Sequence, residues 1–278
     1  MQMKSILIRI VIAGLIIIGA ACFAIFSKPI GIPVLNYHQI NDVDENMLTV
    51  STSEFEAQMA WLEENGYKTI TASELADALE GKGALPEHPV LITFDDGYID
   101  NYQCAFPILK KHQMKAIIFL ISDYISMYPN YLTWEQLFEM QAAGIEFGSH
   151  TLDHTVLTDL PLADAERELT GSKNILQNRL GRKIDFLAYP CGFTNSDIKA
   201  RVKAAGYRAA FTVELGNVAP GDDVYALNRV PVFGAMPHTM LRFSGRLHCP
   251  RFAAWLENLQ KELIRTGHSG IAELIPAL

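Results

Sequence analysis

Short apolar runs recur along most of this chain, and stretches with the apolar spacing of a helix separate them. The runs are rich in Val, Ile, Leu and Phe, which is typical of strands that are buried on both faces. The predicted strands cover residues 32–37, 69–70, 90–94, 116–121, 145–148, 186–189, 209–213 and 227–230.

Helix-capping signals follow several of these runs. A hydroxyl residue followed three positions later by Glu or Gln marks a helix start: Ser53 with Glu56, Thr71 with Glu74, and Thr133 with Gln136. The predicted helices cover residues 53–65, 71–81, 98–112, 133–144, 162–180, 196–205 and 252–266. Within the third of these, Pro107 must kink or divide the helix.

Strands that alternate with helices predict a parallel sheet. Seven or so such units favour a closed (β/α) barrel over an open, doubly wound sheet. No Gly-x-Gly-x-x-Gly motif follows the first strand, so the sequence gives no support to a dinucleotide-binding fold.

The first 28 residues have a different character. Lys4 and Arg9 precede residues 10–26, which carry no charge. Together with the apolar residues just before it, this run is about long enough to span a bilayer as one transmembrane helix. Positive charges ahead of the run predict that the N-terminus is inside the cell and the remainder outside. We therefore expect residues 1–28 to be a retained single-pass membrane anchor, with residues 29–278 as an extracytoplasmic domain.

Two alternatives to an anchor stay open. The segment Ala20–Ala24 could be the cleavage region of a secretory signal, which would release the domain. Cys22 could be the lipid-bearing cysteine of a lipoprotein, although Gly19 stands where an aliphatic residue is usual.

Composition limits the class of protein. The chain has 278 residues, 49 % of them hydrophobic, which is enough for one large domain. The net charge of −8 and the absence of a basic stripe argue against a nucleic-acid partner. The four cysteines show no CxxC spacing and so predict neither a zinc knuckle nor a dense disulfide framework; a bridge from Cys249 to Cys104 or to Cys191 stays open.

Candidate chemistry gathers where predicted strands end. Asp95 and Asp96 follow the strand at 90–94, and Gly97 then turns the chain. His150 and His154 follow the strand at 145–148, and two histidines four residues apart can approach one cation. One Asp with two His is a ligand set that leaves metal positions open, and the second Asp is free to act as a base. Metal-assisted hydrolysis needs this combination.

The stretch Thr93–Tyr98 and the His150–His154 segment resemble the first two motifs of the NodB-type polysaccharide deacetylases, carbohydrate esterase family 4. The resemblance covers roughly residues 32–232. The segment Ile32–His38 is similar to the opening strand of the subgroup that deacetylates poly-β-1,6-N-acetylglucosamine in biofilms. The resemblance implies a distorted (β/α)7 barrel, preceded here by the transmembrane helix.

The resemblance also implies roles for individual residues. Asp96, His150 and His154 would hold a divalent metal, most plausibly zinc, with nickel and cobalt as alternatives. Asp95 would be the general base, and His38 would be the general acid that protonates the leaving amine. His238 is the rival acid, because the wider family places its acid late in the chain.

The third family motif, Arg-x-Pro-Tyr-Gly, is altered in this chain. The segment reads Ala188–Gly192, with Ala188 in place of the Arg and Cys191 in place of the Tyr. A backbone donor survives a side-chain change, so the Cys191 N–H is expected to bind the oxyanion. Tyr98, Tyr189 and Pro190 are expected to contact the substrate.

These inferences predict a membrane-anchored, metal-dependent N-deacetylase of N-acetylglucosamine polysaccharides. Poly-β-1,6-N-acetylglucosamine is the favoured substrate, followed by peptidoglycan or chitooligosaccharide and then by O-acetyl xylan. A catalytically silent carbohydrate-binding barrel is the alternative outside the enzymes, and the four intact Asp and His residues argue against it.

Overall fold

A computed structural model describes residues 31–234 and 239–267. Gly31–Phe243 form one compact unit, and the chain from Ser244 onward belongs to a second. The predicted transmembrane segment, residues 1–28, lies outside the described residues. Among the residues that are described, no helix is long and apolar enough to cross a membrane.

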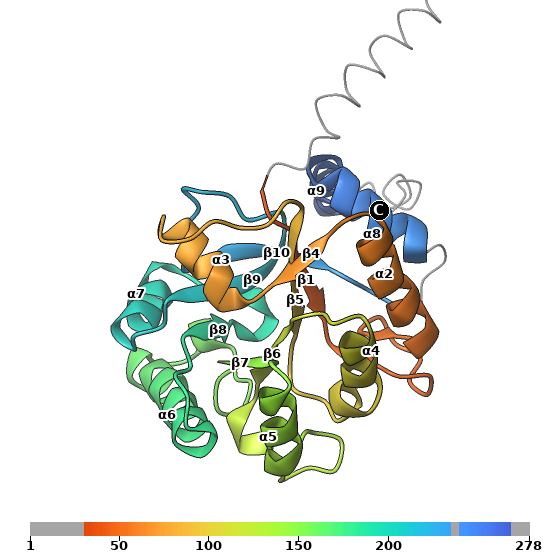
Figure 1. Ribbon diagram of the computed structural model, residues 1–278. Coiled ribbons are helices and arrows are strands. Elements are labelled where there is room, and N and C mark those ends of the chain that lie inside the picture. Colours follow the sequence, from red (N-terminus) through yellow and green to blue (C-terminus); the bar gives the residue numbers. More distant parts are fainter. Residues whose placement is uncertain (1–30, 235–238, 268–278) are drawn as a thin grey trace, which may run out of the picture. The chain divides into compact units, whose positions relative to one another are not determined.

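Seven parallel strands close into a ring in the first unit (Figure 1). Their order around the ring is β1, β10, β9, β8, β7, β6 and β5, and β5 pairs with β1 to close it. The ring confirms the predicted (β/α)7 barrel. Its strands are β1 (Val34–Tyr37), β5 (Pro89–Phe94), β6 (Ile117–Leu120), β7 (Glu146–Ser149), β8 (Phe186–Ala188), β9 (Ala209–Leu215) and β10 (Leu227–Pro231).

Strand β5 has three neighbours, which accounts for the distortion of the barrel. Leu91 is paired with Val34 of β1 on one side and with Ile70 of β4 (Lys68–Ile70) on the other. Further along, Phe94 is paired with β1 and with Ile118 of β6. The first half of one β5 edge therefore pairs with β4 and the second half with β6. A separate two-stranded pairing joins β2 (Gln39–Ile40) and β3 (Thr49–Val50), neither of which the sequence pattern predicts.

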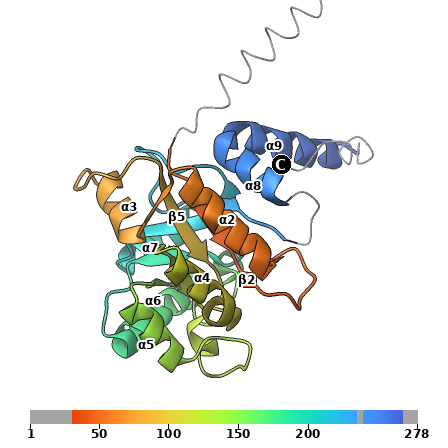
Figure 2. The same ribbon diagram turned by 45° about the vertical axis from the view of Figure 1, so that its right-hand side comes forward.

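Helices surround the strands of this unit (Figures 1 and 2). Those of the first unit are α2 (Thr52–Glu64), α3 (Ala72–Leu79), α4 (Phe106–Lys111), α5 (Trp134–Ala142), α6 (Leu162–Leu180) and α7 (Ser196–Ala204). Helix α8 (Thr239–His248), which was not predicted, runs across the boundary between the units, and α9 (Pro250–Arg265) confirms the predicted C-terminal helix. Arg246 of α8 and Glu257 of α9 form an ion pair at 2.7 Å.

Two predicted helix starts need correction. Helix α2 is capped by Ser51 with Glu54, two residues before the predicted Ser53. Both pairs satisfy the capping pattern, so local sequence cannot choose between them. The predicted helix at 98–112 is a π-helix, Asn101–Ala105, followed by α4 with Pro107 in its first turn, where a missing N–H is tolerated. The caps at Thr71 and Thr133 are confirmed.

The barrel interior changes from apolar to polar along β5 and β10. Alternate residues of a strand share a face. On the inward face of β5, Leu91 belongs to the apolar core, while Thr93 and then Asp95 follow it on the same face. On β10, Leu227 lies in the core and Arg229 comes next on its face. The carboxyl ends of β5 and β10 therefore contribute to a buried polar layer above an apolar one.

Candidate active site

Asp95 is the centre of the buried polar layer. Its side chain is 2 % exposed, and Arg229, which is fully buried, donates to both of its oxygens, from Nη1 to Oδ1 at 2.8 Å and from Nη2 to Oδ2 at 2.7 Å. Asn36 Nδ2 donates to Oδ2 at 3.0 Å. This bidentate contact fixes the plane of the carboxylate, because Nη1 and Nη2 of the guanidinium each donate to a different carboxylate oxygen.

Arg229 is the functional residue that the sequence analysis missed. Two further donors are also used, since Nε donates to the Thr212 carbonyl at 2.7 Å and Nη1 to Thr93 Oγ1 at 3.2 Å. The arginine that the third family motif lacks at Ala188 is thus supplied from the last strand of the ring. The available signal was an arginine within a short predicted strand, because an arginine that a strand buries is rarely left unpaired.

This pairing keeps Asp95 ionised. Burial alone would raise the pKa of Asp95, but the charges of Arg229 and His150, together with the Arg229 hydrogen bonds, outweigh it and hold the pKa well below its usual range. The carboxylate is therefore available as a proton acceptor at neutral pH.

Asp96, His150 and His154 converge on one point, as predicted. The carboxylate oxygen Oδ1 of Asp96 lies 3.4 Å from Nε2 of each histidine, and one ligand atom from each residue lies within 4.8 Å of the others. Asp96 Oδ1 is buried and has no hydrogen-bond partner. An orphaned buried oxygen that faces two imidazole nitrogens fits a divalent cation, because a cation would satisfy all three groups together.

The histidine tautomer also suits a metal ligand. Nδ1 of His150 lies 2.7 Å from the carbonyl oxygen of Ala188, which can only accept, so Nδ1 carries a hydrogen and Nε2 is the ring nitrogen that faces Asp96 and would bind a metal. His154 is held through its backbone, whose N–H donates to Thr151 Oγ1 at 3.1 Å.

The backbone of the site is strained. Asp96, Thr151, His154 and Cys191 have positive φ angles between 57° and 71°, a region that residues with side chains rarely adopt. Glu168 of α6 holds the histidine loop by accepting from the N–H groups of Leu152 at 2.9 Å and Asp153 at 3.4 Å. Strain of this kind persists only where surrounding contacts enforce it, and it concentrates at functional sites.

His38 lies next to the aspartates, as predicted for an acid. Its Nε2 atom is 3.9 Å from Asp95 Oδ2, its side chain is 17 % exposed, and its Nδ1 has no hydrogen-bond partner. Burial lowers the pKa of His38, while the charges of Asp95 and Asp96 oppose that shift. The rival acid, His238, lies outside the described residues.

The other predicted site residues fall in different environments. Cys191 is exposed and sits in the turn Pro190–Gly192 that follows β8. Tyr189 is fully buried, and its hydroxyl donates to the Tyr225 carbonyl at 2.8 Å, so no face of its ring is available for a sugar. Pro190 is buried as well, whereas Tyr98 is partly exposed beside Asp96.

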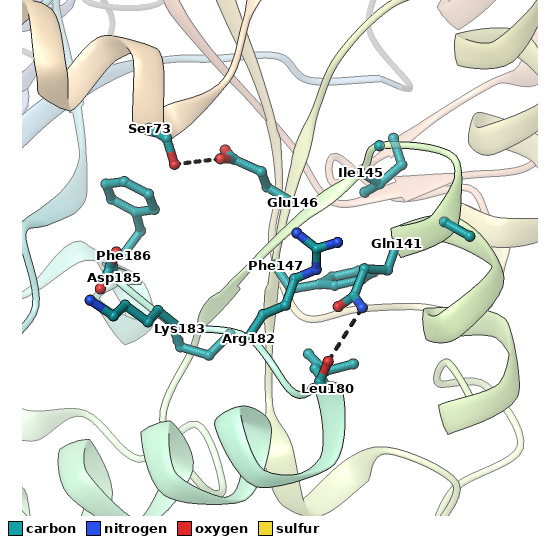
Figure 3. Close-up of a pocket in the computed structure, with 13 residues that line it drawn as sticks. Ser73, Gln141, Ile145, Glu146, Phe147, Leu180, Arg182, Lys183, Asp185 and Phe186 are labelled. Carbon is teal, nitrogen blue, oxygen red and sulfur yellow. Dashed lines mark hydrogen bonds between the residues drawn. The ribbon is translucent and has the colours of Figure 1, made fainter.

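A cavity of about 570 Å³ lies away from these residues (Figure 3). Glu146 and Phe186, which begin β7 and β8, line it together with Arg182 and Lys183. Glu146 points to the start of α3, where it accepts from the Ala72 N–H and from the Ser73 hydroxyl, both at 2.6 Å. In parallel barrels the amino ends of the strands contribute to stability and the carboxyl ends to catalysis. The cavity is therefore not the candidate active site.

Comparison with known proteins agrees with the geometry. Residues 82–210 match the family model described as polysaccharide deacetylase. YxkH of Bacillus subtilis, which is named provisionally as a polysaccharide deacetylase, is 41 % identical over 75 % of this chain and 74 % of its own length. The poly-β-1,6-N-acetyl-D-glucosamine N-deacetylase of Staphylococcus epidermidis is 30 % identical over 75 % of this chain and 81 % of its own length.

Two solved structures support the same assignment. The Streptococcus pyogenes deacetylase PplD, solved in complex with acetate, superposes with a TM-score of 0.72 at 28 % identity, over 78 % of this chain and 99 % of PplD. IcaB from Ammonifex degensii gives a TM-score of 0.71 at 28 % identity, over 80 % of this chain and 98 % of IcaB. The chain thus belongs to the polysaccharide deacetylase family.

Proposed function

We propose that this enzyme removes acetyl groups from the acetamides of a polysaccharide rich in N-acetylglucosamine, and that poly-β-1,6-N-acetylglucosamine is its substrate. The observation that carries the proposal is the position of Asp95, held by Arg229, beside the convergent group of Asp96, His150 and His154. The name of the S. epidermidis relative supports the choice of polysaccharide.

Asp96, His150 and His154 would hold a divalent cation, most plausibly zinc because imidazole and carboxylate ligands with open positions suit it. When bound, such a cation would supply Lewis acidity to the site. Asp95 accepts a proton from the attacking water, and Arg229 and Asn36 keep its carboxylate oriented for this transfer.

His38 completes the proton transfers. Cleavage of the C–N bond gives acetate and an amine, and the amine nitrogen must gain a proton as it leaves. His38, 3.9 Å from Asp95, would donate that proton; burial lowers its pKa, and the two neighbouring carboxylates partly oppose that shift by favouring the charged form. The Cys191 backbone N–H, in the turn after β8, would stabilise the oxyanion.

The place of action follows from residues 1–28. We propose that they anchor the enzyme in the cell membrane by a single pass, with the catalytic unit on the extracytoplasmic side, where an exported polysaccharide is accessible. The charge-free run at 10–26, with positive charges before it, supports this location.

Acetate release from β-1,6-linked N-acetylglucosamine oligomers tests the proposal directly. The chain from Lys28 onward would be assayed with a chelator, without it, and after zinc is restored. Release that the chelator stops and zinc restores is expected. Release from chitooligosaccharide or peptidoglycan alone would refute the proposed substrate. Binding of these glycans without any release would mean that the protein is a carbohydrate-binding barrel and not an enzyme.

A further inference from the structure

The segment between β6 and α5 carries three tyrosines that pack together with Tyr98. The Tyr98 and Tyr131 rings are stacked, with centroids 5.1 Å apart. Tyr124 meets Tyr128 and Tyr131 edge to face, at 4.9 Å in each case. We call this group, Tyr98, Tyr124, Tyr128 and Tyr131, the tyrosine cluster.

Hydrogen bonds tie this segment to both stretches that carry the candidate metal ligands. On one side, the Ile99 N–H donates to the Asn130 carbonyl and the Leu132 N–H to the Gly97 carbonyl, both at 2.9 Å.

On the other side, the N–H groups of Ser122 and Asp123 donate to the carbonyls of Thr151 and Leu152, at 3.1 and 3.0 Å. The Tyr124 hydroxyl also donates to the Asp153 carbonyl at 3.3 Å. The cluster is thus held in a fixed position beside Asp96 and His154.

The cluster is not part of the hydrophobic core. Tyr128 is 49 % exposed and the adjacent Met127 is 70 % exposed, while Tyr98, Tyr124 and Tyr131 are partly exposed. The phenols are neutral at physiological pH, because the ordinary pKa of a tyrosine side chain is about 10. A neutral, partly exposed aromatic surface can bind an uncharged sugar ring through the apolar face of that ring.

Building on the proposed function, we propose that the tyrosine cluster is a sugar-binding subsite, which holds a pyranose ring of the polysaccharide next to the residue that is being deacetylated. A pyranose presents C–H groups on its faces and hydroxyls on its rim. The aromatic rings can contact the former, and the phenol groups can hydrogen-bond the latter. Because hydrogen bonds join the cluster to the segments that carry the candidate metal ligands, we expect the substrate polymer to be its occupant.

Replacement of Tyr128 by Ala tests the subsite, because this ring is exposed and its loss leaves the backbone hydrogen bonds in place. Steady-state acetate release would be measured on β-1,6-linked N-acetylglucosamine oligomers from the dimer to the pentamer. We expect KM for the pentamer to rise about three- to tenfold, as the loss of one aromatic contact predicts. The effect should shrink for the dimer, and kcat should stay within about twofold.

Two matched variants separate stacking from general damage. Tyr128→Phe keeps the ring and loses only the hydroxyl, so its pentamer KM should rise less than that of Tyr128→Ala. Phe138→Ala removes an aromatic residue of similar exposure, 45 %, from α5 and should leave KM unchanged. An unchanged pentamer KM in Tyr128→Ala, or an equal change at every oligomer length, would overturn the subsite.

A direct measurement of binding tests the subsite independently of the proposed deacetylase activity. Pentamer binding to the chelator-treated protein, followed by tyrosine and tryptophan fluorescence, requires no turnover. Absence of acetate release with a weakened Tyr128→Ala affinity would refute the deacetylase proposal and retain the subsite. If instead Tyr128→Ala lost binding to phosphatidylglycerol vesicles while oligomer binding was unchanged, the cluster would be a lipid contact and the subsite would be refuted.

Discussion

At the scale of single residues, Arg229 and Asp95 depend on each other. Both are buried, and each satisfies the charge of the other through two hydrogen bonds. A buried charge that loses its partner is far more costly than a surface charge that loses one, because water cannot replace the missing contacts.

We predict that Arg229→Gln lowers the free energy of unfolding by about 3–5 kcal/mol, which urea denaturation would measure. The matched control is Arg208→Gln. Arg208 pairs with Asp77 and Glu80 near the surface, and its side chain is 28 % exposed, so a loss of only about 0–1 kcal/mol is expected. Equal losses in the two variants would contradict the importance of the Asp95–Arg229 pair.

His38 gives a second prediction at the scale of single residues. We predict that His38→Asn lowers kcat for acetate release about 10²- to 10⁴-fold, as the loss of a general acid does, and leaves the amount of bound zinc unchanged. The control is His112→Asn, because His112 pairs with Glu63 at 2.9 Å and has no proposed role in the site. Full activity of His38→Asn would transfer the acid role to another residue, of which His238 is the first to test.

At the scale of elements, α6 supports the loop that carries the candidate metal ligands. Glu168 accepts two backbone N–H groups between His150 and His154. We predict that Glu168→Ala weakens zinc binding about 10- to 100-fold, as the loss of an outer-shell partner typically does, measured by competition with a chromogenic chelator.

The control for this prediction lies two residues earlier on the same helix. Glu166 pairs with Arg201 at the surface, at 2.7 Å, so Glu166→Ala should leave zinc affinity unchanged. A Glu168→Ala protein with wild-type zinc affinity would show that the loop keeps its shape without α6.

The turn after β5 gives a second prediction at this scale. Gly97 has φ +77°, and a Cβ there would lie 2.7 Å from Leu120 Cδ2. Gly66 has nearly the same φ, +76°, but open space around it. We predict that Gly97→Ala destabilises the protein by about 1–3 kcal/mol more than Gly66→Ala in thermal or urea unfolding, because overpacking adds to the shared backbone strain. Equal losses would mean that Leu120 moves aside at little cost.

The sequence predicts the elements better than it predicts the contacts between them. The apolar runs locate the ring strands within a few residues, because burial on both faces leaves a continuous apolar signal. The two motifs locate Asp96, His150 and His154, because each motif directly follows a predicted strand. The contact of Arg229 with Asp95 joins strands that are far apart in the chain, and the split pairing of β5 depends on strand neighbours, so neither leaves a local pattern.

At the scale of the whole molecule, the proposed anchor in residues 1–28 would decide where the enzyme acts. We predict that the full chain sediments with membranes and that the chain from Lys28 onward stays in the soluble fraction. Mass spectrometry of the protein recovered from cells would test retention, since an intact N-terminus is expected. A mature chain that begins between Ala21 and Lys28 would establish a cleaved signal instead.

The position of Arg229 in the chain also determines when the active site can form. Asp95 leaves the ribosome 134 residues before its partner. At typical rates of synthesis that interval is on the order of ten seconds. During this time the nascent chain already carries both motifs, but Asp95, the proposed base, lacks the guanidinium that balances its charge. Under the proposed mechanism, catalytic competence would be among the last properties that the growing polypeptide acquires, and a chain that terminates just before β10 would lack it.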